Sequence, residues 1–81
     1  MGKKPKLNKK QQALVDTLTL PDGLTRVVNP FSGAVAVLEP LQYAVYHDIK
    51  KSEVAEDYTR MRLGLDIFRR NWSDDYYDLL D

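Results

Sequence analysis

The side chains best suited to catalysis are scarce in this chain. His47 is the only histidine and there is no cysteine, so one chain offers neither two histidines nor a thiolate to a metal ion. The spacing places His47 beside Tyr43 and Lys50 on a helix, on the side facing solvent. The serines stand at predicted turn or cap positions, where serine is expected for backbone reasons rather than as a nucleophile: Ser32, Ser52 and Ser73.

The acidic residues are numerous but dispersed, and the glycines match neither a dinucleotide-binding nor a phosphate-binding loop. Helix capping, or pairing with an arginine four residues away, accounts for the acidic groups without invoking a site. The pairs expected are Glu56 with Arg60 and Asp66 with Arg70, and Asp74-Asp75 should begin a helix. We therefore predict no catalytic residue, no metal ligand and no cofactor.

A basic segment begins the chain. The first ten residues hold five lysines and no acid, which leaves seven Lys/Arg against all twelve Asp/Glu in the rest. Such a segment makes weak, sequence-independent contacts with nucleic-acid phosphates, or acts as a solubilising tail, or screens the acidic body. It has no aromatic residue to stack on a base. The candidate nucleic-acid-binding residues are Lys3, Lys4, Lys6, Lys9 and Lys10.

Four apolar or aromatic residues are candidates for contact with a protein partner. Leu63 and Ile67 are one helical turn apart and lie opposite the main apolar stripe of their helix. Either that helix is central, with its back covered by the hairpin or the first helix, or these two residues form an exposed contact surface. Tyr43 and Tyr46 form a second candidate surface, because tyrosine gives a large contact area at little entropic cost.

Length and composition favour one small domain. The chain has 81 residues, of which 43% are hydrophobic, so it can fold but buries only about 60% of its unfolded surface. Its longest apolar run, Ala34–Leu38, is too short to cross a bilayer, and polar residues stand where the apolar core of a signal peptide is expected. We expect a cytoplasmic protein without a membrane partner, present as a monomer or a weak homodimer.

The first half of the chain predicts an arm, a helix and a β-hairpin. Residues 1–8 form a flexible basic arm, and residues 9–81 form a single α+β domain. Asn8 and Gln11 have the spacing of a capping box, so a helix should run from Lys9 to Thr19. The β-prone runs Leu24–Val28 and Ala34–Leu38 flank Asn29-Pro30-Phe31-Ser32-Gly33, which has the residue order of a hairpin turn.

The second half predicts a helical hairpin. Pro40 suits the first position of a helix that runs to about Lys51, and Ser52 or Glu53 should restart the chain. A long helix is expected from Val54 to Asn71, and a short one, capped by Ser73, over Tyr76–Leu80. The long helix carries an apolar stripe expected to face inward: Val54, Tyr58, Met61, Leu65, Phe68 and Trp72. The fold class is α+β: an N-terminal helix, one β-hairpin, a helical hairpin and a short C-terminal helix.

One resemblance covers roughly residues 26–81. Its motifs are Val28-Asn29-Pro30-Phe31-Ser32-Gly33, Leu38-Glu39-Pro40, Ala44-Val45-Tyr46, Gly64-Leu65, Phe68-Arg69 with Asn71, and the final Leu79-Leu80-Asp81. In these the chain resembles small uncharacterised proteins encoded by tailed bacteriophages. The resemblance implies a viral accessory protein in the cytoplasm of an infected bacterium, and it assigns no functional residue.

Two functional hypotheses follow. The first is a non-enzymatic protein-interaction module, as a phage accessory protein that binds a bacterial host protein through an aromatic and apolar surface. The second is a nucleic-acid-associated protein that uses the lysines of the N-terminal arm for non-specific phosphate contacts.

Overall fold

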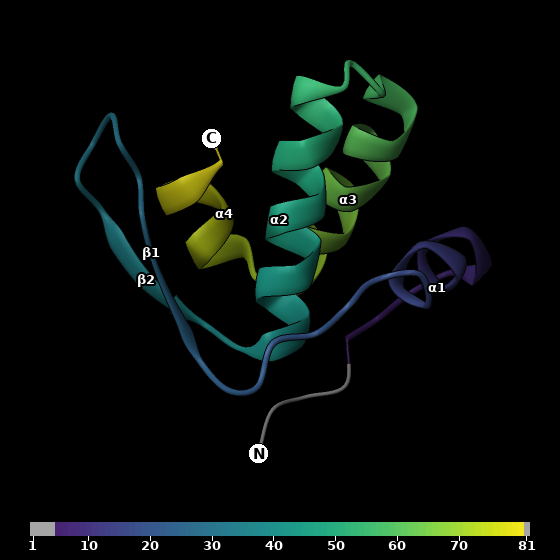
Figure 1. Cartoon of the computed structure of the whole chain (residues 1–81), viewed down its shortest axis with the longest axis horizontal. Coiled ribbons are helices and arrows are strands. Elements are labelled where there is room, and N and C mark those ends of the chain that lie inside the picture. Colours follow the sequence, from purple (N-terminus) through teal and green to yellow (C-terminus); the bar gives the residue numbers. More distant parts are fainter. Residues whose placement is uncertain (1–4, 81) are drawn as a thin grey trace.

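The structure is a computed structural model that describes residues 5–80. Its elements, in order, are α1 (Lys9–Val15), β1 (Thr25–Val28), β2 (Val35–Leu38), α2 (Pro40–Val54), α3 (Tyr58–Asn71) and α4 (Ser73–Leu79). Helices α2 and α3 lie side by side as a helical hairpin, with the β-hairpin and α4 on one side and α1 on the other (Figure 1). The predicted α+β fold and its order of elements are confirmed.

The predicted capping box of α1 is present. Asn8 Oδ1 accepts a hydrogen bond from the Gln11 N–H at 2.8 Å, and Gln11 Oε1 accepts one from the Asn8 N–H at 3.0 Å. The helix ends at Val15, four residues before the predicted end. There the N–H of Thr17 donates to the Leu14 carbonyl, and the Thr17 hydroxyl donates to the same oxygen, so local bonds compete with continuation of the helix.

The β-hairpin is confirmed, with each strand one residue shorter at its start than predicted. Val28 pairs with Val35 and Thr25 with Leu38 in an antiparallel register. The Asn29 N–H donates to the Ala34 carbonyl at 2.8 Å. Gly33 has a φ of 78°, a left-handed conformation that glycine adopts without a steric penalty.

The connection between α2 and α3 differs from the prediction. Helix α2 continues to Val54 and holds Ser52 buried within it, so the chain does not restart at Ser52 or Glu53. Glu56 adopts a left-handed φ of 58° in the turn, and the Asp57 carboxylate then caps α3 by accepting the Arg60 N–H at 3.2 Å. The residues after Val54 therefore belong to a turn rather than to the third helix.

The predicted inward stripe is correct from Met61 onward and wrong for its first two members. Val54 is 85% exposed and Tyr58 is 55% exposed, whereas Phe68 is completely buried. Because the turn comes later than predicted, Val54 belongs to α2 and not to the face of α3 that it was predicted to share. The remaining members, Met61, Leu65 and Trp72, are half-buried against the core.

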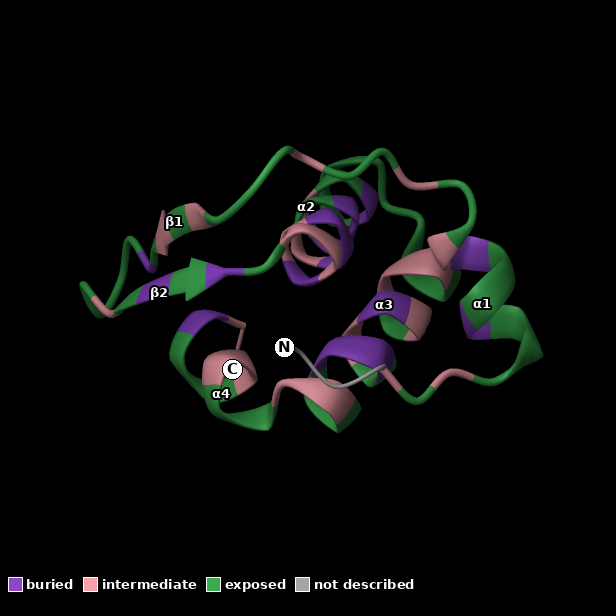
Figure 2. Ribbon diagram, turned by 90° about the horizontal axis from the view of Figure 1, so that it is seen from below, coloured by how far each residue is buried: buried purple, intermediate pink, exposed green. Residues whose placement is uncertain are grey.

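Close packing of α2 on α3 depends on Gly64. A Cβ atom at this position would lie 2.7 Å from Cγ1 of Ile49, so only glycine lets the two helices approach this closely. Buried residues gather where α2, α3 and α4 face one another (Figure 2). The core cluster contains Leu14, Ala36, Leu38, Val45, Ile49, Ile67, Phe68 and Leu79.

Helix α4 begins three residues earlier than predicted. Ser73 is its first residue, and Trp72 occupies the cap position without a side-chain hydrogen bond, so the prediction that Ser73 caps this helix is wrong. The ring centroids of Trp72 and Phe68 lie 5.4 Å apart, which anchors the start of α4 to the core. Asn29 Nδ2 donates to the Asp78 carbonyl at 2.8 Å and thereby fixes the hairpin turn to α4.

Candidate functional site

Tyr43 and Tyr46 lie together on α2, as their spacing predicted. Both are half-buried, and their ring centroids are 6.4 Å apart. The exposed His47 stacks on Tyr43 at 5.9 Å between centroids, and Lys50 Nζ lies 5.7 Å from the centre of the Tyr46 ring. Burial, with Tyr43 as the smaller cause, raises the pKa of Tyr46 above its ordinary 10.0, so this phenol stays neutral at physiological pH.

Ile67 is a core residue rather than a contact residue. It is completely buried, and Leu63 is half-buried against the same core. Because α1 packs on α3, the back of α3 is covered, as the central-helix alternative required. The alternative in which Leu63 and Ile67 form an exposed contact surface is therefore wrong for Ile67, which no partner can reach while the domain stays folded.

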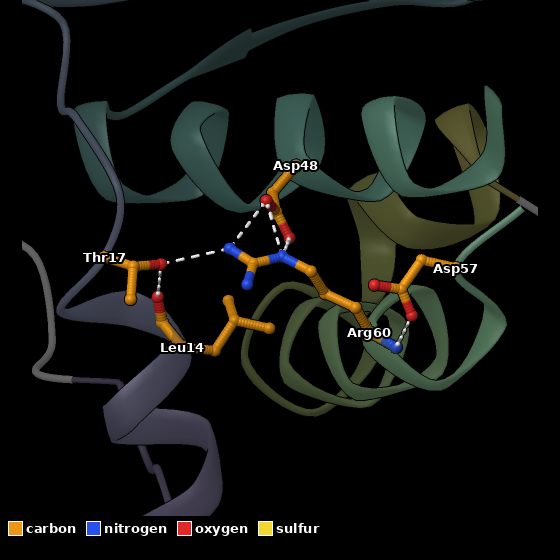
Figure 3. A network of polar contacts seen from close by, with 5 residues as sticks. All are labelled: Leu14, Thr17, Asp48, Asp57 and Arg60. Carbon is orange, nitrogen blue, oxygen red and sulfur yellow. Dashed lines mark hydrogen bonds and ion pairs between the residues drawn. The ribbon is translucent and has the colours of Figure 1, made fainter. Parts of the chain in front are cut away.

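A polar network links α1, α2 and α3 (Figure 3). Arg60 Nε donates to both oxygens of Asp48 at 3.0 Å, and its terminal Nη2 lies 3.0 Å from Asp48 Oδ1. The same Nη2 donates to the Thr17 hydroxyl at 3.0 Å, which in turn donates to the Leu14 carbonyl at 2.7 Å. The pairing of Arg60 with Glu56 expected from helical spacing is replaced by this contact between helices.

A groove of about 400 Å³ lies beside this network. The segment from Thr17 to Pro21 forms one wall, and Tyr43, His47 and Lys51 of α2 form another. The Arg60 guanidinium on its border is already bonded to a carboxylate and a hydroxyl, so it is held in place rather than poised to move a proton. Among residues 5–80, no three His, Cys, Asp or Glu side chains are grouped to hold a metal ion.

The outward side of the β-hairpin is an exposed apolar surface. The alternation of side chains along a strand and the observed register place Arg26 opposite Val37 and Val28 beside Val35 on this side. The three valines are between 46% and 56% exposed. We call Arg26, Val28, Val35 and Val37 the hairpin face.

The tip of the hairpin carries an exposed aromatic residue. Phe31 is 97% exposed, although its backbone is fixed, since its N–H donates to Asn29 Oδ1 at 2.8 Å. Asn29 is itself buried and bonded to α4. An aromatic ring is therefore presented to solvent from an anchored turn, next to the hairpin face.

Lys9 and Lys10 begin the first helix as predicted, whereas Lys6 is attached to α3 within the predicted flexible arm. Lys3 and Lys4 lie outside the described residues. The Lys6 N–H donates to Asn71 Oδ1 at 2.7 Å, and Asn71 Nδ2 donates to the Lys6 carbonyl at 3.2 Å. The chain is thus attached to α3 before residue 8, where the flexible arm was predicted to end, and Lys9 and Lys10 belong to the first turn of α1.

The residues of the hairpin face were visible in the sequence only as parts of β-prone runs. In β2 all four residues are apolar, so alternation cannot reveal which side faces solvent.

No helix within residues 5–80 is long and apolar enough to cross a membrane. No family model, curated protein or solved structure matches the chain.

Proposed function

We propose that the protein is a non-enzymatic protein-interaction module that binds its partner through the hairpin face and Phe31. The observation that carries this proposal is the group of valines and a phenylalanine exposed on an anchored hairpin. A small domain gains stability from every apolar residue that it buries. Apolar side chains left together on one surface are therefore typical of a site that a partner covers.

The hairpin face also indicates the chemistry of the partner. Arg26 lies opposite Val37 and two residues before Val28 on the same side of the hairpin. The ion pairs among residues 5–80 join Arg60 to Asp48 and Arg69 to Asp66, and do not include Arg26. A complementary surface would be apolar and would place a carboxylate opposite Arg26. The resemblance to phage-encoded proteins extends the proposal to a partner from the infected bacterium.

The size of the hairpin face sets the expected strength of binding. Each strand has four residues and spans roughly 13 Å at about 3.3 Å per residue. Two strands of this length present a surface much smaller than the roughly 800 Å² that each partner buries in a standard interface. We therefore expect a transient interaction in which Phe31 acts as an anchor beside the hairpin face.

The test compares a double variant of the hairpin face with a single control variant on α2. Val35→Thr with Val37→Thr keeps the β-branched shape but makes the hairpin face polar, whereas Val54→Thr makes the same change at an exposed valine on α2. Immobilised protein is incubated with bacterial lysate at low and high salt, and circular dichroism verifies folding. We expect a bound protein that persists at high salt, is retained by V54T and is lost with V35T/V37T.

Two results would contradict the proposal. If no protein binds, or if V35T/V37T and V54T bind alike, the hairpin face is not the interface. Sedimentation of the purified protein tests whether a second copy of the chain covers the hairpin face. A dimer that V35T/V37T abolishes would assign the hairpin face to a second copy of the chain instead.

A further inference from the structure

Helix α1 lies on the opposite side of α2 and α3 from the β-hairpin (Figure 1), and its first turn lies near the second half of α3. A polar depression of about 490 Å³ separates the two helices there, lined by Asn8, Gln11, Asp66, Arg69 and Arg70. Lysines precede and follow Asn8 in the chain. We call Lys6, Lys9, Lys10, Arg69 and Arg70 the basic surface.

The lysines come near the arginines because Asn71 holds the Lys6 backbone at the end of α3 and because Asn8 and Gln11, which flank Lys9 and Lys10 in the chain, line the same depression as Arg69 and Arg70. Asn71 fixes the backbone of Lys6 immediately after Arg69 and Arg70. The capping box between Asn8 and Gln11 fixes the first turn of α1, which contains Lys9 and Lys10. Residues more than fifty positions apart in sequence are therefore brought to one end of the domain.

The positive charge of the basic surface is largely uncompensated. Asp66 is the one acid among the residues that line the depression, and it lies 3.9 Å from Arg69, with both side chains more than half exposed. A pair this long and this exposed is worth little in water. The ion pairs among the described residues include neither Arg70 nor a lysine of the basic surface.

We propose that the basic surface binds the phosphate backbone of a nucleic acid. Its cations are spread along two helices and the segment before α1, rather than converging on one point, which suits an extended polyanion better than a single phosphate. Arginine can hold phosphate through two parallel hydrogen bonds. No aromatic residue belongs to the basic surface, so bases are not stacked and binding is independent of sequence.

The rest of the molecule orients this contact. We leave out the basic surface, Lys3, Lys4 and Asp66. The rest of the chain then carries five Lys/Arg against eleven Asp/Glu. The acidic remainder is repelled by phosphates while the basic surface is attracted. A nucleic acid is thus bound on the side away from the hairpin, which leaves the hairpin face free. This inference is independent of the proposed protein partner.

The test uses a 20-base-pair DNA duplex of random sequence and fluorescence anisotropy over a series of salt concentrations. Five phosphate contacts give a slope of log K against log salt of about −4.5. We expect Arg69→Gln with Arg70→Gln, and separately Lys9→Gln with Lys10→Gln, each to reduce the magnitude of that slope by about 1.8. Lys50→Gln with Lys51→Gln removes the same charge from α2 and should leave the slope unchanged.

Three results would overturn this inference. Absence of binding at 50 mM salt is the first. The second is an equal effect of all three double variants, because binding would then depend on the net charge of the protein and not on the basic surface. The third is competition by poly-glutamate as effective as that by the duplex, which would assign the basic surface to acidic peptides. Circular dichroism verifies that each variant is folded.

Discussion

At the scale of single residues, Arg60 shows how one side chain joins three elements. Its guanidinium contacts Asp48 on α2 and Thr17 after α1 while its backbone lies in α3. Asp48 is buried, whereas the Arg60 side chain is 37% exposed. Partial exposure weakens the ion pair itself, but loss of the arginine would leave a buried carboxylate without its donors.

We predict that Arg60→Met lowers the free energy of unfolding by about 1–3 kcal/mol, chiefly because Asp48 loses its hydrogen-bond donors. Arg62→Met, at an exposed position on the same helix, should change it by less than about 0.5 kcal/mol. Urea denaturation measures both variants. Adding Asp48→Asn to Arg60→Met should cost less than the sum of the two single changes, and equal losses for Arg60→Met and Arg62→Met would refute the role of the network.

At the scale of elements, the packing of α2 on α3 depends on how closely the α3 backbone approaches α2 at Gly64. Gly64 faces Ile49 so closely that even a methyl group does not fit. Ile49 is β-branched and has few alternative rotamers in a helix, so it cannot easily move aside. The helical hairpin therefore depends on a glycine in the middle of α3, at the expense of about 1 kcal/mol in helix propensity.

Gly64→Ala should consequently destabilise the domain, although alanine is the better helix former. We expect a net loss of about 1–3 kcal/mol from overpacking, measured by thermal or urea denaturation. Ile49→Ala combined with Gly64→Ala provides the control, because it removes the clashing Cγ1 atom. The double variant should be more stable than the sum of the single effects predicts, and strict additivity would show that the clash is relieved elsewhere.

At the scale of the whole molecule, the two ends of the described chain are held by side-chain amides. Asn71 ties Lys6 to the end of α3, and Asn29 ties the hairpin turn to α4. These contacts position the basic surface and the hairpin face on different sides of the domain. The two proposed partners, a nucleic acid and a protein, would therefore bind on different sides of the domain.

We predict that Asn71→Ala detaches the segment before α1. Loss of the two bonds to the Lys6 backbone should lower the free energy of unfolding by about 1–2 kcal/mol and speed hydrogen exchange of the Lys6 amide, which NMR can follow. Gln12→Ala removes an exposed side-chain bond within α1 and should leave that amide unchanged. An unaltered Lys6 exchange rate in the Asn71 variant would contradict the anchoring role.

The sequence by itself determined the elements that depend on neighbouring residues. Asn8 with Gln11, the turn from Asn29 to Gly33, and Pro40 at a helix start act over three or four positions, and each was confirmed. The local spacing of Tyr43 and Tyr46 was also sufficient to place them together. The Asp57 cap was equally local, but Val54 fitted the apolar spacing of the next helix and concealed the turn.

Only the tertiary structure decided which apolar residues face inward and which charges meet. Ile67 became core and Tyr58 surface, because α1 covers the back of α3 and the turn shifts where α3 begins. The Asp48–Arg60 pair, the attachment of Lys6 to Asn71 and the exposure of the hairpin face likewise depend on contacts between separate elements. Periodicity defines the faces of a helix or strand, but the packing partner determines which face is buried.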